Sequence, residues 1–340
     1  MGIISVFGKE YLGGHSLEEG IHNCETLYLK GIAHYKRPIC STLDILGEEA
    51  KSENAIRSNL DAYLQAIEQL GVLTNNYIEW SKEYGIRVPF TVSVKPSSLC
   101  LFDRKYGEVE FDSKAPLLPN LRRLAEASFT HNIPITIDME DHEWTYPTLK
   151  LIYTFLSEGL PIDSVLQSCL DQTIDDINLF LKHDFPIDKS KITIRACRGI
   201  YQEPKTFATR SPSEAKKRLF HLVDKLFTEG YYIGIATHDP KLQQKIKKEI
   251  IEKRNISKDR YEYQGLKGVY SFEDVILPKA LTNGENVRLY LPVELNPGDG
   301  KAYMRRRILM NPEIDKNFLC DRMKRHLRQK GPENEFKLYN

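Results

Sequence analysis

Short strings of charged and polar residues recur along this sequence, and each follows a run of β-branched or other apolar residues. In chain order they are DILGE at 44–48, SVKPS at 93–97, IDME at 137–140, VLQ at 165–167, IRACRG at 194–199, ATHD at 236–239, EYQ at 262–264 and RLYLP at 288–292. A buried charge is costly unless it meets a partner or a ligand. An internal salt-bridge lattice with polar loops could account for any one string, but their recurrence favours a functional site.

A basic run, KAYMRRR at 301–307, adds cations towards the end of the chain. Such a run is usually the solvated face of a helix, and we expect this for Arg305. The adjacent Arg306 and Arg307 cannot both occupy the centre of one helix face. Their long side chains can nevertheless both reach a small carboxylate, because each guanidinium offers paired hydrogen-bond donors.

The composition is that of a soluble globular protein, and it narrows the function classes. Of 340 residues, 41% are hydrophobic and 28% are charged, and the net charge of +1 gives no reason to expect a nucleic-acid partner. The six cysteines form no CxxC pair, which favours reduced thiols over a disulfide framework or a zinc site. The sequence shows no signal peptide and no apolar run long enough to span a membrane. We expect a cytoplasmic protein, with peripheral contact at the inner face of the membrane as the alternative.

The apolar runs before the polar strings predict strands, and amphipathic stretches between them predict helices. The eight candidate strands are 39–46, 88–94, 133–139, 164–169, 192–196, 232–236, 261–266 and 287–291. Ser211-Pro212-Ser213-Glu214 is a typical helix start, with a capping serine and proline in the first turn. Eight alternations predict an α/β fold, a (βα)8 TIM barrel. An open doubly wound sheet is the alternative, but neither GxGxxG nor a P-loop is present.

Three segments are expected: an N-terminal helical arm over 1–38, the barrel over 39–330 and a polar tail over 331–340. In the arm, Leu17, Ile21 and Leu27 are candidate contacts with the barrel. Barrel enzymes place their active sites at the carboxyl ends of the strands. The polar strings are therefore predicted to meet at one mouth of the barrel.

In this order, the strings resemble the proline dehydrogenase family from about Leu43 to Ile308. The resemblance rests on an LDxLGE-like segment at 43–48, SVKPS, TIDME at 136–140, LQ at 166–167, IRxCRGIY at 194–201, ATHD, EYQ, VRLYLPV at 287–293 and YMRRR at 303–307. Each string alone is weakly specific, whereas one string per strand end is specific. The length resembles that of a monofunctional enzyme without a fused aldehyde dehydrogenase domain.

The resemblance implies an activity. The family oxidises L-proline to 1-pyrroline-5-carboxylate in proline catabolism by hydride transfer to N5 of FAD. Electrons then pass to a quinone, which implies peripheral membrane contact. No side chain is assigned as the base that takes the amine proton, and solvent is a candidate. Oxidation of a modified proline such as hydroxyproline is the alternative within the same chemistry.

The resemblance also implies site residues. Asp138 and Arg195 would be catalytic, Asp138 by ordering the site electrostatically and Arg195 by its charge beside the flavin. The implied cofactor-binding residues are Met139, Gln167, Arg195, Ala196, Arg198, Gly199, Thr237 and His238. The implied substrate-binding residues are Lys95, Arg306 and Arg307 for the carboxylate, Tyr290, Tyr303 and Tyr201 around the ring, and Glu48, which would pair with Arg306 as a gate.

Some positions depart from the family pattern. Arg198 stands where many relatives have lysine, Gln202 where they have tryptophan and Asp239 where they have asparagine. Met310 stands where a glutamate often follows the arginine pair. Gln202 and Met310 could reshape the cofactor contacts, whereas Arg198 keeps the positive charge.

Two other function classes compete with the flavoenzyme. Asp138, His142, His238 and Asp239 could form a metal-dependent barrel hydrolase, but they lack an HxH-type start and no metal is expected. A noncatalytic binding barrel is the second rival. The charged set of Lys95, Asp138, Arg195, Arg306 and Arg307 argues against it, because buried charges without ligands are costly to keep.

Overall fold

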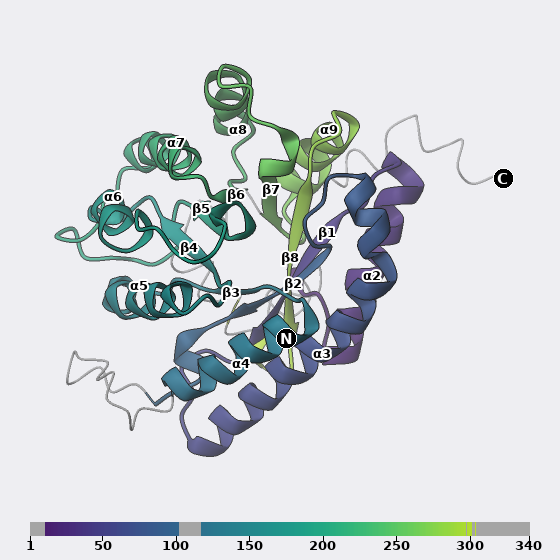
Figure 1. Cartoon of the computed structure of the whole chain (residues 1–340), viewed down its shortest axis with the longest axis vertical. Helices are drawn as coiled ribbons and strands as arrows, with labels where there is room; N and C mark the ends of the chain where they lie inside the picture. The colour runs from purple at the N-terminus through teal and green to yellow at the C-terminus, as the bar shows by residue number, and fades with distance from the viewer. Residues whose placement is uncertain (1–10, 102–116, 297, 301–302, 304–340) are drawn as a thin grey trace, which may run out of the picture.

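The computed structural model describes residues 11–101, 117–296, 298–300 and 303. Eight parallel strands form a closed barrel in chain order, with β8 paired back onto β1, and helices surround the strands (Figure 1). The strands are β1 (Cys40–Leu46), β2 (Phe90–Val94), β3 (Ile135–Ile137), β4 (Asp163–Gln167), β5 (Thr193–Cys197), β6 (Tyr232–Ala236), β7 (Tyr261–Leu266) and β8 (Val287–Glu294). The predicted (βα)8 barrel is therefore confirmed, and the open sheet is wrong.

All eight predicted strands overlap observed ones, and β3 differs most from its prediction. It was expected over 133–139 but spans only Ile135–Ile137. Pro134 has no backbone N–H to contribute to the sheet, so it shortens the start of the strand. At the other end, Asp138 donates its backbone N–H to the carbonyl of Val94 at 2.9 Å, which ties this residue to the tip of β2.

The helices follow from their caps and apolar stripes. They are α2 (Leu17–Tyr35), α3 (Glu53–Glu83), α4 (Leu117–His131), α5 (His142–Ser157), α6 (Thr173–Asp176), α7 (Pro212–Glu229), α8 (Pro240–Ile246) and α9 (Leu277–Thr282). π-helical turns continue α6 over Ile177–Leu181 and α8 over Lys247–Glu252, and another over Ser271–Ile276 precedes α9. The hydroxyl of Ser211 accepts the N–H of Glu214 as predicted, and α7 ends at Gly230, whose φ of 90° suits glycine. Among these helices, none is long and apolar enough to cross a membrane.

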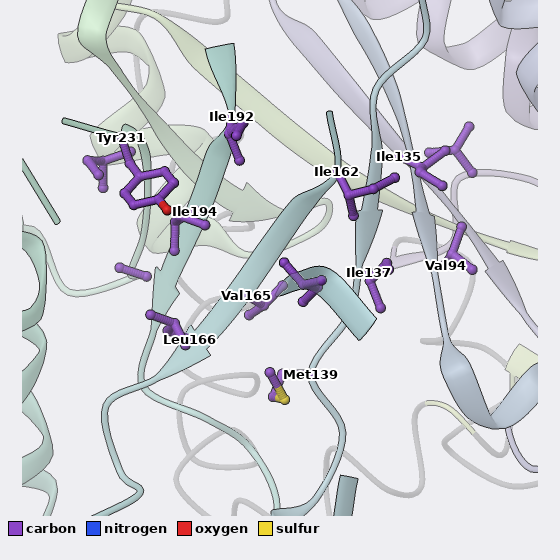
Figure 2. Close-up of a cluster of buried hydrophobic side chains, with 14 of the residues drawn as sticks. Val94, Ile135, Ile137, Met139, Ile162, Val165, Leu166, Ile192, Ile194 and Tyr231 are labelled. Carbon is purple, nitrogen blue, oxygen red and sulfur yellow. The ribbon is translucent and has the colours of Figure 1, made fainter. Parts of the chain in front are cut away.

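The outer faces of the strands form the hydrophobic core with the surrounding helices. Figure 2 shows part of this core along β3, β4 and β5, including Ile135, Ile137, Leu166, Ile192 and Ile194. The five described cysteines are free, and four of them are buried. The core supplies most of the burial that holds the barrel closed.

The N-terminal segment reaches the mouth of the barrel. Gly14 pairs with Val293 of β8, and a side chain at Gly13 would lie 2.7 Å from Cβ of Leu291. Farther along, α2 packs against β1 and β8, with Leu17 buried and Ile21 and Leu27 partly buried against the core.

The interior of the barrel, in contrast, is polar. Thr42 and Thr91 share a hydrogen bond of 2.8 Å across β1 and β2. Deeper in the barrel, Arg288 of β8 donates to Glu262 of β7 at 2.6 Å and to the carbonyl of Ser41 at 2.8 Å. The Arg288 and Glu262 side chains are 6% and 3% exposed, so this ion pair is desolvated.

This buried pair gives a stability prediction. Arg288→Met leaves Glu262 as an uncompensated buried charge, and we expect a loss of about 3–5 kcal/mol in the free energy of unfolding. Urea unfolding followed by far-UV circular dichroism at pH 7 measures it. The matched control is Arg288→Met combined with Glu262→Gln, which removes both charges and should lose clearly less. Equal losses in the two variants would show that charge pairing is not the cause.

Candidate active site

Asp138 is the hub of a charged cluster at the carboxyl ends of the strands. Its Oδ1 accepts from Ser93 Oγ at 2.6 Å and from the Arg195 guanidinium at 2.8 Å. Its Oδ2 accepts from the hydroxyl of Tyr290 at 2.7 Å and lies 3.5 Å from Lys95 Nζ. One carboxylate thus joins side chains from β2, β5 and β8 and from the residue after β2.

Lys95 lies between several acids. Its side chain is 7% exposed, and its ammonium contacts the fully buried carboxylate of Asp44 on β1. Nζ also lies 3.9 Å from Glu48 and 3.5 Å from the hydroxyl of Tyr290. The ammonium is therefore held in one position, between these acids at the mouth.

Arg195 on β5 is held in one plane. Nε donates to the side-chain oxygen of Gln264 at 2.8 Å while Nη1 donates to Asp138. Its guanidinium carbon lies 5.0 Å from the centre of the Tyr290 ring, a cation–π contact. Gln264 in turn donates to Glu262 at 2.7 Å, so the charged cluster at the mouth continues into the Arg288–Glu262 pair below it.

The pKa shifts follow from burial and these contacts. Burial opposes the charge of Asp138, but Lys95 and Arg195 outweigh it and lower the pKa of this carboxyl. Burial likewise opposes the charge of Lys95, yet Asp44, Tyr290 and Asp138 raise its pKa well above the usual value. For Asp44 burial prevails over Lys95 and raises the pKa. The site thus carries an ionised Asp138 and a protonated Lys95 at neutral pH.

A cavity of about 350 Å³ lies between the segment that follows β5 and the start of α7. It is lined by Cys169, residues 198–203, residues 208–212 and Ala215. Of the implied cofactor-binding residues, Arg198 and Gly199 line this cavity. Tyr201, an implied substrate-binding residue, also lines it. Burial, followed by Glu140 and Glu48, raises the pKa of Tyr201 well above its usual value.

The other implied cofactor residues lie at neighbouring strand ends. Gln167 ends β4 and donates to the carbonyl of Glu140 at 2.6 Å, while Met139 and Ala196 are buried in the core. Thr237 and His238 follow β6, and Nε2 of His238 accepts the backbone N–H of Leu266 at 3.0 Å. Since Nε2 is an acceptor, Nδ1 carries the proton when this ring is neutral.

The substrate-binding set is only partly described. Lys95, Glu48, Tyr290 and Tyr201 gather at the mouth. Tyr303 is 4% exposed and packs with Tyr11, Leu12 and Leu46. Arg306, Arg307, Met310 and the tail over 331–340 lie outside the described residues, and so does the predicted pairing of Glu48 with Arg306.

Sequence reasoning missed several residues that hold this site. Asp44, Ser93 and Glu140 all lie within the polar strings, yet none was assigned a role. Their partners, Lys95, Asp138 and Ser97, lie on other strands or loops, 43 to 51 positions away. The alternation of inward and outward residues along β1 and β2 was the available signal, because Asp44 and Ser93 occupy the inward phase that Thr42 and Thr91 also share.

The residues proposed for a metal site make other contacts. His142 pairs with Glu203 at 2.6 Å, and Asp239 caps α8 and pairs with Lys216 at 2.7 Å. Across the described ranges, no three His, Cys, Asp or Glu side chains gather as metal ligands. The hydrolase rival therefore has no ligand cluster in this part of the chain.

A closed (βα)8 barrel with a preorganised charged cluster at the carboxyl ends of its strands defines a barrel-type enzyme. The model of one family, proline dehydrogenase, matches residues 29–210, which is more than half of the chain. The chain belongs to the proline dehydrogenase family, whose activity is the oxidation of proline, and it is therefore an oxidoreductase.

Individual relatives agree with this assignment. The chain is 26% identical over 307 residues to "Proline dehydrogenase 2" of Bacillus subtilis, covering 90% of this chain and 87% of the relative. It is 28% identical over 307 residues to "Proline dehydrogenase" of Deinococcus radiodurans, covering 89% and 86%.

Solved structures agree in fold. Proline utilization A from Bdellovibrio bacteriovorus, inactivated by N-propargylglycine, has a TM-score of 0.72 and 19% identity over 90% of this chain. Proline utilization A from Bradyrhizobium japonicum has a TM-score of 0.66 and 20% identity over 88% of this chain. The chain spans about a third of the length of these proteins, 33% and 30%.

Glu140 gives a pH-dependence prediction. Burial raises the pKa of this carboxyl from 4.5 to about 8 against the opposing hydrogen bonds from Ser97. Between these values the folded protein binds a proton that the unfolded chain has lost. The free energy of unfolding should therefore fall as the pH rises through this window, by up to about 1.4 kcal/mol per pH unit from this group.

The Glu140→Gln variant removes the titration but keeps the shape. Urea unfolding of both proteins between pH 5 and pH 8 should show a wild type that loses stability relative to the variant as the pH rises. Groups common to both proteins cancel in this difference. Parallel pH profiles would mean that Glu140 ionises normally in the folded state.

Proposed function

We propose that this chain oxidises L-proline to 1-pyrroline-5-carboxylate with FAD as its cofactor, and that a quinone takes the electrons. Family membership gives the substrate class. The observation that carries the assignment to this site is the pair of cations held in place by Asp138 at the carboxyl ends of the strands, namely Lys95 and Arg195.

The residues around the cavity fit an FAD phosphate group. Arg198 and Arg210 line it, and Ser211 and Pro212 bring the N-terminus of α7, an 18-residue helix, to its wall. Guanidiniums and a helix N-terminus both favour phosphate oxygens.

Gly199 supports the same fit. It has a φ of 97°, and a side chain there would lie 2.5 Å from Sγ of Cys169 and 2.6 Å from Oε1 of Gln167. Only glycine fits this position, so the backbone beside Arg198 presents no side chain to a ligand. Arg198, Gly199, Thr237 and His238 would hold the cofactor, together with Met139, Gln167 and Ala196.

The flavin, when bound, supplies the acceptor for the hydride from the proline carbon next to the ring nitrogen. Arg195 would favour negative charge close to that acceptor, because Asp138 and Gln264 fix its guanidinium in one orientation. Asp138 would keep Lys95 and Arg195 a set distance apart. These residues orient and stabilise; no described side chain is assigned as the base for the amine proton.

The substrate carboxylate would be gripped by Lys95 together with Arg306 and Arg307. Tyr290 would form one wall of the ring pocket, with Tyr201 and Tyr303 completing it. Glu48, 3.9 Å from Lys95, would close over the bound substrate by pairing with Arg306. Such closure excludes water and fixes the geometry of hydride transfer.

Electron transfer to a quinone would bring the protein to a membrane surface as a peripheral partner. The basic segment over 241–254 is the candidate contact. Several of its charges already have partners, since Lys247 lies 3.0 Å from Glu285 and Arg254 lies 2.5 Å from Asp224. This pairing supports the interpretation of the segment as an outer barrel face in solvent.

The experiment that tests the function is an anaerobic titration of the purified protein. We expect a yellow protein whose flavin absorption bleaches with L-proline and not with D-proline. Arg306→Met should keep the flavin while the L-proline concentration needed for bleaching rises at least about tenfold, since a charge-assisted hydrogen bond is lost. A colourless protein, or a flavin that L-proline does not bleach, would overturn the proposal.

Substrate choice tests the ring pocket separately. In related hydroxyproline dehydrogenases, the residue at the position of Tyr303 has a smaller side chain, which leaves space for the extra hydroxyl. A tyrosine here therefore favours unsubstituted proline. We expect wild type to prefer L-proline over trans-4-hydroxyproline in kcat/KM, and Tyr303→Ser to narrow that preference. Tyr303→Phe, which keeps the ring, is the matched control and should retain the preference. A wild type that prefers hydroxyproline would assign the chain to the modified substrate instead.

A further inference from the structure

Glu140 is a buried acid that the proposed reaction does not use. It follows Asp138 and Met139 after β3 and is 6% exposed. Both of its carboxyl oxygens accept from one residue, Ser97, whose backbone N–H donates to Oε2 at 2.9 Å and whose hydroxyl donates to Oε1 at 2.5 Å. This paired contact fixes both the position and the hydroxyl orientation of Ser97.

Ser97 in turn forms hydrogen bonds with the loop that follows β1. Its hydroxyl, which donates to Glu140, accepts the backbone N–H of Glu49 at 3.0 Å. Its carbonyl accepts the backbone N–H of Ala50 at 3.0 Å. Glu49 and Ala50 belong to residues 47–52, the segment between β1 and α3 that carries Glu48 and is called the Glu48 loop below.

The Glu48 loop needs such an anchor. Glu49 has a φ of 53°, in the left-handed region that costs about 1 kcal/mol or more for residues other than glycine. Asn59 holds the start of the loop, where its amide donates to the carbonyl of Gly47 at 3.2 Å. Ser97 holds the part beyond Glu48, so Glu48 lies between two tethers.

We propose that Glu140 is a positioning residue. It acts through Ser97 to hold the Glu48 loop in the conformation that places the Glu48 carboxylate 3.9 Å from Lys95 Nζ. The geometry points to an indirect role, because both hydrogen bonds of the Glu140 carboxyl come from Ser97, the loop anchor, while Lys95 and Glu48 act on it only as nearby charges. The role for catalysis rests on the proposed function, in which Glu48 closes the site. The mechanical link between Glu140 and the loop can be tested without substrate.

The first experiment measures hydrogen exchange of individual backbone amides in the purified protein. In Glu140→Ala the Glu49 amide should exchange about fivefold to tenfold faster than in wild type, the scale of one lost buried hydrogen bond. Ser97→Ala should give the same increase at Glu49 and a smaller one at Ala50, whose acceptor is a carbonyl that the variant keeps. Compared above pH 8, where the wild-type carboxyl is ionised, Glu140→Gln retains one acceptor oxygen and should fall between Glu140→Ala and wild type.

The matched control is Ser98→Ala. It removes a hydroxyl from the adjacent residue, one that donates to the carbonyl of Lys95 at 2.6 Å and not to Glu140. We expect its Glu49 amide to exchange as in wild type. A Glu49 amide that is unchanged in both Ser97→Ala and Glu140→Gln would overturn the link, even if Glu140→Ala does not fold.

The second experiment is a double-mutant cycle on L-proline oxidation with Glu48→Gln. Glu140→Ala should lower kcat/KM about fivefold, mainly through KM, in the wild-type background. With Glu48 already replaced, the same change should cost less than about twofold, because the loop no longer presents the carboxylate. Full additivity would reject the route through Glu48. A wild type inactive on L-proline would refute the proposed function. The amide exchange would still show whether Glu140 holds the Glu48 loop.

Discussion

The site depends on one carboxylate, that of Asp138, shared between two buried cations. Neither the Lys95 ammonium nor the Arg195 guanidinium could remain desolvated without a nearby anion, since an unpaired buried charge is far more costly than a paired one. Asp138 lies 3.5 Å from the first and 2.8 Å from the second. Ser93 and Tyr290 donate to the same carboxylate, so its oxygens are satisfied from three strands. The positions of both cations are therefore set before any substrate arrives.

This arrangement extends through the barrel as a chain of alternating partners. It runs from Asp44 through Lys95, Asp138, Arg195, Gln264 and Glu262 to Arg288. The lower end is satisfied by backbone carbonyls, as where Arg288 donates to Val88 at 2.7 Å. The upper end faces the mouth, where an incoming carboxylate can compete for Lys95. Stability and binding thus depend on the same network of contacts.

Much of this could be predicted from the sequence, and the limits have a physical cause. Strands such as β6 and β7 were predicted with their observed bounds because apolar runs and turn residues are local signals. The order of the polar strings predicted which strand ends meet. The partners were not predictable, because they meet only through pairing between strands. Lys95 reaches Asp44 because β2 pairs with β1, and Arg288 reaches Ser41 because the barrel closes between β8 and β1. Which residue of one string lies level with which residue of the next depends on the register between strands, and one sequence does not fix that register.

The cluster combines rigid and adjustable parts, and this division bears on how such a site can close. Arg195 and Tyr290 lie within strands, and Asp138 is bound to β2 through its backbone, so these groups move only if the barrel moves. Glu48 and Tyr201 lie on loops whose conformation depends on side-chain tethers, from Ser97 and Asn59 for the Glu48 loop. A tether of one or two hydrogen bonds can open at a cost that a bound substrate can repay, whereas a strand cannot. The strands of the barrel therefore fix the positions of the charged groups, and the loops control access to them.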